Sequence, residues 1–267
     1  MKTDSHTPLA KRLKLFVVDL DGTLLGGGHV PYVRIPDKVS AWLDELAEAG
    51  CKWAINTTWD PDGQYQLVLA SPLKSRPTYF MGELGFRVAR CTPTGPEPVK
   101  EYCAAQQERI DEWKREHFFP FIRKFLARFI PMRFLFYGHL MEMTLRQEDS
   151  ADFLKLARDE ANPEFLQVGG GGPGFSVMPP FLNKGLGLAE VVRLEGLEPD
   201  QVGAAGDSPA DMAMMTPNLS RYYVAPGNAH EDVKKHVLAN GGAVSEKLCG
   251  EGTVEAFREL DSRLRIT

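Results

Sequence analysis

Hydrophobic residues in the first 82 positions form short apolar runs that alternate with segments of helical spacing. The runs at 15–19, 51–57 and 78–82 have the length and composition of strands buried on both faces. Between them, apolar residues in 37–50 recur at helical spacing and end at a glycine, and 61–70 is expected to form a short helix. This alternation predicts a parallel α/β sheet with right-handed connections.

The same alternation returns after residue 183. A helix, two strands and two helices are expected in turn, near 186–197, 201–207, 221–226, 229–239 and 253–265. The sheet is therefore interrupted and then resumed. We predict a Rossmann-like parallel-sheet core formed by residues 1–84 and 183–267, with an inserted α/β cap domain at 85–182.

The cap region has a different pattern. A long polar helix, a basic amphipathic segment, a hairpin, a helix and two strands are expected in it, at 98–116, 119–131, 133–146, 149–161, 165–168 and 175–178. The last two strands flank VGGGGPG at 168–174, which lacks both the P-loop and the dinucleotide-binding signatures. We expect these glycines to form a mobile loop between two cap strands.

The amphipathic segment FPFIRKFLARFIP has two interpretations. Phe121, Phe125, Phe129, Ile122, Leu126 and Ile130 share one helical face, and Arg123, Lys124 and Arg128 lie on the other. Such a helix can lie on a membrane, but more often its apolar face packs into its own domain. We expect packing within the cap and no membrane contact.

Composition limits the class of protein. The chain has 267 residues, of which 43% are hydrophobic and 25% charged, as is typical of a globular protein. A net charge of −5 gives no general attraction to nucleic acid or anionic lipid, so no nucleic-acid partner is expected. The first dozen residues lack the apolar core of a signal peptide, and no apolar run is long enough to span a bilayer. We expect a cytoplasmic protein whose four separated cysteines are reduced.

Two pairs of acids follow predicted strands. Asp19 and Asp21 end the run LFVVDLDG, and Asp207 and Asp211 follow QVGAA in GDSPADM. An isolated DxDG is often only a turn. Because the carboxyl ends of parallel strands meet at one edge of the sheet, two such clusters are expected to converge there. Carboxylates gathered in this way suit Mg²⁺, with waters and a substrate phosphate completing its coordination.

Further residues at this edge suit a phosphate group. Thr57 and Thr58 end the second strand and can donate hydrogen bonds to an anion, as can the backbone N–H of Leu20. Lys184 lies where the core resumes and can supply a positive charge. Taken singly, such threonines are usually structural and such lysines usually solvated.

In this order, DLDGT, a strand-end threonine, a lysine before glycine and GDSxxDM resemble the haloacid dehalogenase superfamily of phosphotransferases. The large insert resembles the α/β cap of its sugar-phosphate phosphatase branch, which includes sucrose- and trehalose-phosphatase-like enzymes and phosphomannomutases. The segment 223–236, YVAPGNAHEDVKKH, also resembles that branch. The resemblance covers nearly the whole chain.

The resemblance implies a role for each of these residues. Asp19 would be the nucleophile that forms an aspartyl-phosphate, and Asp21 would protonate the leaving group and then activate water. Mg²⁺ would be held by Asp19, the backbone carbonyl of Asp21, and Asp207, and Asp211 would support the ion or orient Lys184. Thr57 and Lys184 would hold the transferring phosphoryl group.

The chain departs from the family pattern twice. Thr57 is followed by Thr58, Trp59 and Asp60 where Gly-Arg is common, and Ala210 stands where asparagine is common. The predicted function is a Mg²⁺-dependent phosphatase for a small phosphorylated metabolite, expected to be a sugar phosphate. Two alternatives stay open: a phosphomutase of the phosphomannomutase type and a non-catalytic phosphate-binding or regulatory protein. The oligomeric state is not readable from the sequence.

Overall fold

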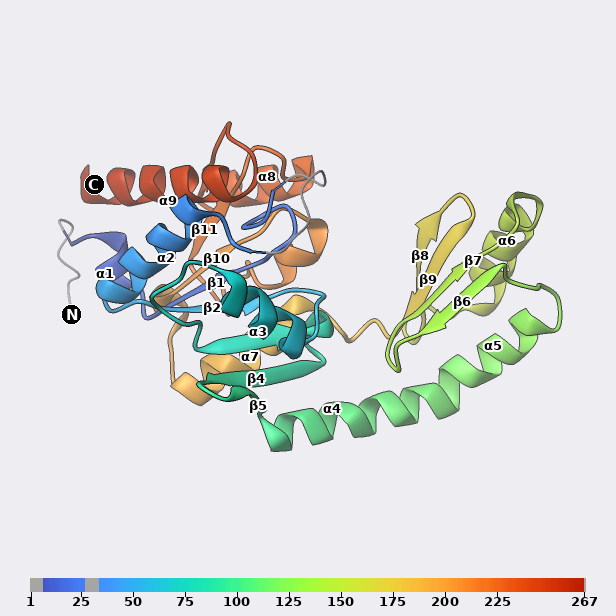
Figure 1. Ribbon diagram of the computed structural model, residues 1–267. Coiled ribbons are helices and arrows are strands. Elements are labelled where there is room, and N and C mark those ends of the chain that lie inside the picture. Colours follow the sequence, from blue (N-terminus) through green and yellow to red (C-terminus); the bar gives the residue numbers. More distant parts are fainter. Residues whose placement is uncertain (1–6, 27–33, 267) are drawn as a thin grey trace. The chain divides into compact units, whose positions relative to one another are not determined.

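The computed structural model describes residues 7–26 and 34–266, and the chain divides into two compact units (Figure 1). The core unit comprises Met1–Tyr102 and Asn183–Thr267, and the cap unit comprises Cys103–Leu182. The predicted class, a parallel-sheet α/β core with an inserted α/β cap, is confirmed. Each unit has its own sheet and its own hydrophobic core.

An eight-stranded sheet runs through the core unit. Its parallel strands are β1 Leu15–Val18, β2 Lys52–Asn56, β3 Tyr79–Gly82, β10 Val202–Ala205, β11 Tyr222–Ala225 and β12 Ala243–Val244. Two antiparallel strands, β4 Arg87–Thr92 and β5 Gly95–Pro98, extend one edge. The order is β12-β11-β10-β1-β2-β3-β4-β5, so β1 lies between β10 and β2.

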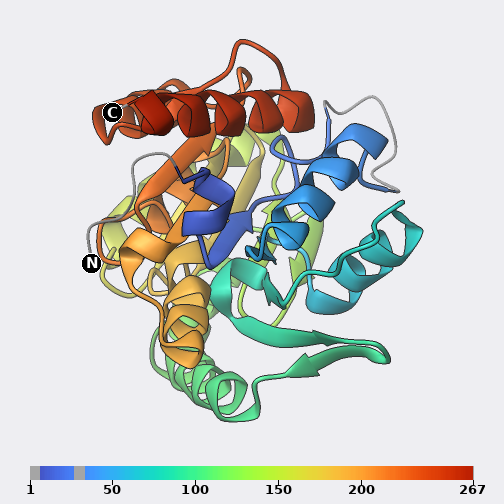
Figure 2. The same cartoon turned by 90° about the vertical axis from the view of Figure 1, so that its left-hand side faces the viewer.

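Helices cover both faces of this sheet. On one face lie α1 Leu9–Arg12, α2 Asp37–Glu48, α3 Pro61–Ala70 and α9 Cys249–Ile266. On the other lie α7 Lys184–Glu195, the 3₁₀ helix η5 Pro209–Ala213 and α8 Glu231–Ala239. Helices α2 and α9 pack against each other (Figure 2). The rings of Trp42 and Phe257 lie 5.3 Å apart. Both faces of β1 are therefore buried, as its apolar run predicts.

The predicted elements of the core agree with the structure, but the predicted start of the cap is too early. Residues 87–98 form β4 and β5, which pair with β3 and with each other, so they belong to the core sheet. The cap unit begins at Cys103 instead of residue 85. The two antiparallel strands are half exposed, and they carry little of the apolar pattern that marks the other strands. The two-residue strand β12 has no recognisable pattern and is a further addition to the prediction.

The cap unit contains a four-stranded antiparallel sheet in the order β6-β7-β9-β8. Its strands are β6 Arg133–Phe136, β7 Met141–Thr144, β8 Gln167–Gly171 and β9 Gly174–Met178. Helix α4, Lys100–Trp113, leads through a π-helical turn, Lys114–Phe118, into α5 Phe119–Leu126, and α6 Ser150–Glu160 follows β7. Phe125 of α5, Phe153 of α6 and Phe175 of β9 belong to one buried cluster.

The expectation of a mobile loop at 168–174 is wrong. Residues 167–171 form strand β8, and Gly169 and Gly170 pair with Ser176 and Phe175 of β9. Only Gly172 and Pro173 form the turn between the two strands. Gly170 has a φ of +99°, and a Cβ there would lie 2.3 Å from the carbonyl oxygen of Gly174, which explains glycine at this point of the strand.

The amphipathic segment packs into the cap. Phe121, Ile122, Phe125 and Phe129 are buried in the cap's hydrophobic cluster. Leu126 and Ile130, expected on the same face, are 49% and 79% exposed; Ile130 lies beyond α5, which ends at Leu126. Among residues 7–26 and 34–266, no helix combines the length and the apolar character that a membrane span requires.

Asp44 of α2 fixes the loop that leads to β3. Its carboxylate accepts hydrogen bonds from the backbone N–H groups of Lys74 and Ser75 at 2.7–3.1 Å. Burial by itself would raise the pKa of Asp44, but the hydrogen bonds from Ser75 and Lys74 outweigh it and hold that pKa below its ordinary value. The ionised form of Asp44 therefore stabilises the folded state.

We expect Asp44→Asn to lower the free energy of unfolding by about 1–3 kcal/mol at pH 7, because charged acceptors form the stronger hydrogen bonds. The depressed pKa makes this contribution complete above the pKa of an unfolded aspartate, about 3.9, and diminishing as pH falls below it. Urea unfolding of both proteins at pH 7 and pH 3 measures the difference. A gap that widens toward pH 3 would contradict this assignment.

Candidate active site

Asp19 lies at the carboxyl end of β1, in the centre of the core sheet. Its backbone N–H donates to the carbonyl of Ala205 at 3.0 Å, which continues the pairing of β1 with β10 by one residue. The chain then turns sharply, because the carbonyl of Leu20 accepts hydrogen bonds from the N–H groups of Thr23, Leu24 and Leu25. The backbone N–H of Leu20 donates to the Asp19 carboxylate. This turn leaves Asp19 only 3% exposed.

Lys184 contacts an acid from each of the two acidic motifs, DLDGT and GDSPADM. Its Nζ lies 2.6 Å from Oδ1 of Asp19 and 2.5 Å from Oδ1 of Asp211. All three side chains are buried. Asn183 caps α7, with its side chain accepting from the N–H of Leu186, so Lys184 is the first residue of a well-anchored helix. The sequence predicts that these three residues converge, and the structure brings them into direct contact.

Asp211 uses its second oxygen to organise its own loop. Oδ2 accepts from the backbone N–H groups of Asp207 and Ser208 at 3.0 and 2.8 Å, and from the Ser208 hydroxyl at 2.9 Å. Ser208 and Asp211 thus form a capping box at the start of η5. This arrangement fixes Asp211 Oδ1 toward Lys184. It does not involve the side chain of Ala210, which is exposed.

Asp207 is held by two residues that the sequence analysis did not single out. The Thr23 hydroxyl donates to Oδ1 of Asp207 at 3.0 Å, and the Asn228 amide lies 3.3 Å from Oδ2. The same amide donates to the carbonyl of Gly22 at 2.9 Å, which ties the first loop to the last. Thr23 lies in the motif DLDGT and Asn228 in the segment YVAPGNAHED. Their place in these motifs is the sequence feature that could have identified them.

The three acids Asp19, Asp207 and Asp211 form a group that suits a divalent cation. One carboxylate oxygen from each lies within 4.8 Å of the others. When all three carboxylates are ionised, Lys184 balances one of their negative charges and two remain without a counter-charge. Oxygen donors and this charge balance fit Mg²⁺. The carboxylate of Asp21 is outside this group, and the expected contact through its backbone carbonyl stays a prediction.

Burial and repulsion between carboxylates raise the pKa values of two of these acids. Burial, strengthened by the charge of Asp211, raises the pKa of Asp19 to about 7, although Lys184 opposes the shift. Burial and Asp211 likewise raise the pKa of Asp207. Burial would lower the pKa of Lys184, but Asp19 and Asp211 outweigh it and keep this pKa above its ordinary value. Lys184 therefore stays charged, and additional positive charge at this site would favour ionised carboxylates.

Asp21 points to a different neighbour. Its Oδ2 accepts a hydrogen bond of 2.8 Å from the indole N–H of Trp59. Trp59 stands in one of the two places where the chain departs from the family pattern, so the departure supplies a group that orients the Asp21 side chain. Its carbonyl also accepts from the Gln64 side chain at 2.9 Å, which anchors the loop to α3.

Thr57 and Thr58 are placed differently although they are adjacent. Thr57 is 1% exposed, and its N–H donates to the carbonyl of Met81, while its hydroxyl oxygen is buried without a hydrogen-bond partner among the described residues. A buried hydroxyl without a partner is costly, which makes Thr57 a candidate donor to a bound anion. Thr58 is exposed. Nearby, Asn56 donates to the carbonyl of Lys184 at 2.8 Å and links β2 to α7.

Solved structures with the same fold come from several organisms. A protein from Thermoplasma acidophilum is 17% identical, with a TM-score of 0.64 over 93% of this chain and 98% of that chain. The sucrose-phosphatase from Synechocystis, solved with sucrose and phosphate, is 18% identical, with a TM-score of 0.64 over 94% and 98%. A phosphatase of the haloalkanoate superfamily from Bacteroides thetaiotaomicron is 16% identical, with a TM-score of 0.59 over 97% of each chain. No curated protein sequence matches the chain.

A family model described as haloacid dehalogenase-like hydrolase matches residues 100–242, more than half of the chain. The matched region contains Lys184, Asp207 and Asp211, three of the four side chains that converge at the end of β1. Together with the fold and the order of the motifs, this match confirms the predicted resemblance: the chain belongs to the haloacid dehalogenase-like hydrolases.

Proposed function

We propose that this hydrolase is a Mg²⁺-dependent phosphatase that acts on a small phosphorylated metabolite, a sugar phosphate, through an aspartyl-phosphate at Asp19. The observation that carries the proposal is the contact of Lys184 Nζ with both Asp19 and Asp211 at the end of the central strand. A buried cation beside a carboxylate nucleophile suits a reaction in which negative charge is transferred and must be stabilised.

Phosphoryl transfer to Asp19 is the first step of the proposed reaction. An ionised Asp19 oxygen forms a bond to phosphorus while the bond from phosphorus to the leaving oxygen breaks. Asp21, held by the Trp59 indole, gives its proton to that oxygen, so the product leaves as an alcohol. Lys184 and the Thr57 hydroxyl donate to the phosphoryl oxygens as they pass from substrate to enzyme.

Hydrolysis of the aspartyl-phosphate completes the cycle. The Asp21 carboxylate now accepts a proton from water, the water oxygen forms a bond to phosphorus, and the bond to Asp19 breaks. Phosphate is released and Asp19 is regenerated. Asp19, Asp207 and Asp211 would hold Mg²⁺, which when bound supplies positive charge to the phosphoryl oxygens. Thr23 and Asn228 fix the position of Asp207 for this purpose.

Phosphate release from p-nitrophenyl phosphate and a panel of sugar phosphates tests the proposal. We expect release that requires Mg²⁺ and stops with EDTA. The absence of release with every substrate and metal would refute it. Isomerisation of a sugar phosphate that depends on a bisphosphate activator, with little free phosphate, would instead favour the phosphomutase. Ligand binding without turnover would favour the regulatory protein.

Gly22 offers a structural prediction for the metal site. Its φ is +77°, and a Cβ there would lie 2.2 Å from Oδ2 of Asp207. Gly22→Ala must displace Asp207, so we expect kcat/KM to fall about 100-fold and the Mg²⁺ concentration for half-maximal activity to rise. Gly26→Ala is the matched control, because a Cβ there comes no closer than 3.8 Å to its nearest neighbour. Equal Mg²⁺ dependence in both variants would contradict the role of Asp207.

A further inference from the structure

Strand β6, Arg133–Phe136, forms one edge of the cap sheet (Figure 1). Among the described residues, no strand pairs with its outer side. The unpaired N–H and C=O groups of an edge strand can pair with another chain, and natural edges are often shielded by charges or proline. Strand β6 has one charged residue, Arg133, and no proline. Its outer side is therefore a candidate site for pairing with another chain.

The backbone of β6 leaves two residues available for such pairing. The N–H of Tyr137 donates to the carbonyl of Leu140 at 2.8 Å. Hydrogen-bonded and non-hydrogen-bonded pairs alternate along an antiparallel ladder, so every second residue from Tyr137 back to Arg133 directs its N–H and C=O groups at β7. The residues between them, Phe134 and Phe136, direct theirs outward.

The two ends of β6 limit how far a partner strand can pair. The N–H of Met132 donates to the carbonyl of Thr144 at 2.8 Å, so it is used inside the cap. Beyond Tyr137 the chain turns at Gly138, whose φ is +85°. The outward pairing segment is therefore short and centred on Leu135, with one donor and one acceptor on either side of it.

Exposed apolar side chains surround this edge. Six of the large hydrophobic side chains that are exposed among the described residues lie in or near β6: Phe119, Ile130, Met132, Phe134, Phe136 and Tyr137. The ring of Phe136 stacks on Phe118, 5.0 Å away, which joins the strand to the start of α5. At 150–250 Å² for a large side chain, the exposed parts amount to roughly 600 Å² per copy. Each partner in a specific interface buries about 800 Å², so this surface approaches the area that a stable dimer needs.

We propose that this surface, the outer edge of β6 with its exposed apolar side chains, is the interface of a homodimer in which β6 pairs antiparallel with β6 of a second copy. Pairing Phe134 with Phe136 of the second copy, and Phe136 with Phe134, uses every outward group of both residues in four hydrogen bonds. Leu135 then faces Leu135 of the second copy across the two-fold axis.

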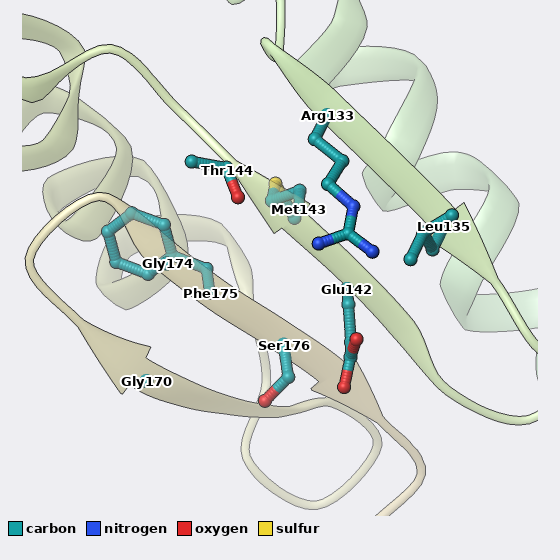
Figure 3. Close-up of a pocket in the computed structure, with 9 residues that line it drawn as sticks. All are labelled: Arg133, Leu135, Glu142, Met143, Thr144, Gly170, Gly174, Phe175 and Ser176. Carbon is teal, nitrogen blue, oxygen red and sulfur yellow. The ribbon is translucent and has the colours of Figure 1, made fainter.

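The same register brings compatible side chains together. The two Phe134–Phe136 pairs lie on the helix-covered face, because their partners in β7 are buried in the hydrophobic cluster of the cap. Figure 3 shows Arg133 on the opposite, open face, where it comes next to Tyr137 of the second copy. Aromatic pairs and a cation beside an aromatic ring are favourable cross-strand contacts. No like charges face each other across this interface.

Other occupants fit this surface less well. A lipid bilayer would cover the apolar side chains but would leave the N–H and C=O groups of Phe134 and Phe136 without partners, which is costly in an apolar medium. Pairing of β6 with the opposite edge strand, β8, would bury less apolar surface, because β8 has glycine at 169–171. It would also leave an edge free on each copy, whereas the symmetric β6 pair closes at two copies.

Disulfide cross-linking of the full chain tests the register. In a non-hydrogen-bonded antiparallel pair the Cα atoms lie about 4.5 Å apart, which suits a disulfide. Leu135→Cys, treated with oxidised glutathione as the oxidant, should therefore form a cross-linked dimer. Tyr137→Cys is the matched control, because residues 137 of the two copies lie four positions out of register, about 13 Å apart along the strands. The wild type measures any cross-linking by the native cysteines.

Sedimentation velocity tests the dimer itself. The wild type should be dimeric at about 100 µM, above the micromolar dissociation constants of the weaker interfaces of this size. Phe134→Pro removes an outward N–H from each copy and no hydrogen bond inside the cap, so it should raise the dissociation constant at least about tenfold. Leu248→Thr, which alters a 62% exposed side chain of the core unit, is the control and should dimerise as the wild type does. Circular dichroism checks that each variant is folded.

Three results would overturn the proposal. The first is a wild type that stays monomeric at every concentration; binding of this monomer to phosphatidylserine vesicles would identify a membrane as the occupant. The second is a dimer that Phe134→Pro does not weaken. The third is cross-linking of Leu135→Cys no faster than that of Tyr137→Cys. The dimer does not depend on the proposed phosphatase function, so a chain that dimerises but releases no phosphate would refute that function alone.

Discussion

Asp19→Asn is expected to abolish phosphate release, lowering kcat by at least about 10⁴-fold. The amide cannot attack phosphorus, and no other described carboxylate occupies the same position at the end of β1. The fold should be little affected, because asparagine has nearly the same shape. The variant also removes a carboxylate whose pKa burial raises to about 7, so it relieves an unfavourable buried charge. Steady-state release from p-nitrophenyl phosphate with saturating Mg²⁺ measures the loss.

Asp200→Asn is the matched control for this substitution. Asp200 is exposed in the turn before β10, at the end of that strand opposite to Asp207. Asp200→Asn removes the same charge far from the site, so the activity of this variant should equal that of the wild type. Residual activity of Asp19→Asn near the wild-type level would remove the proposed mechanism.

Lys184→Met is expected to have the second largest effect and to act on stability as well as activity. It leaves Asp19 and Asp211 buried, 3% and 0% exposed, without their cation. Breaking a buried ion pair by removing one partner typically costs about 3–5 kcal/mol, and we expect a loss of that size in the free energy of unfolding at pH 7. Activity should fall at least about 1,000-fold, because the phosphoryl oxygens lose their fixed positive charge.

The loss of stability should shrink as pH falls. Burial and the charge of Asp211 raise the pKa of Asp19, and without Lys184 nothing of comparable size opposes them, so protonation of Asp19 favours the folded state. Urea unfolding in EDTA at pH 7 and pH 5 measures this change. Lys38→Met, which removes an 82% exposed lysine from its pair with Glu251, should change stability far less than Lys184→Met does. A Lys184→Met protein as stable as Lys38→Met would contradict the central place of Lys184.

Sequence pattern was most informative where strands are buried on both faces. The run at 15–19 and the strands near Trp53 and Phe80 have no polar side, so their apolar residues mark them directly. The antiparallel strands β4 and β5 are half exposed, and their membership in the core sheet depends on the pairing of β4 with β3 and of β5 with β4, which no local pattern reveals. For the same reason, glycines 169–171 were assigned to a loop although they form a strand.

The acids and the lysine of the candidate site could be predicted from the sequence, because their positions follow from the ends of parallel strands. Asp19, Asp211 and Lys184 are far apart in sequence, yet the sheet topology brings them together. The supporting contacts were not predictable. The indole of Trp59 reaches Asp21 and the amide of Asn228 reaches Asp207 only through loop conformations that no periodicity encodes.

The phosphorylated intermediate is the most direct test of the account. Asp21→Asn should still be phosphorylated by p-nitrophenyl phosphate, whose leaving group needs no proton, but should hydrolyse the intermediate slowly because the base is lost. Acid quenching and peptide mass spectrometry of this variant should find phosphate on Asp19 alone. Turnover with no phosphorylated residue, or phosphate on a residue other than Asp19, would contradict the account.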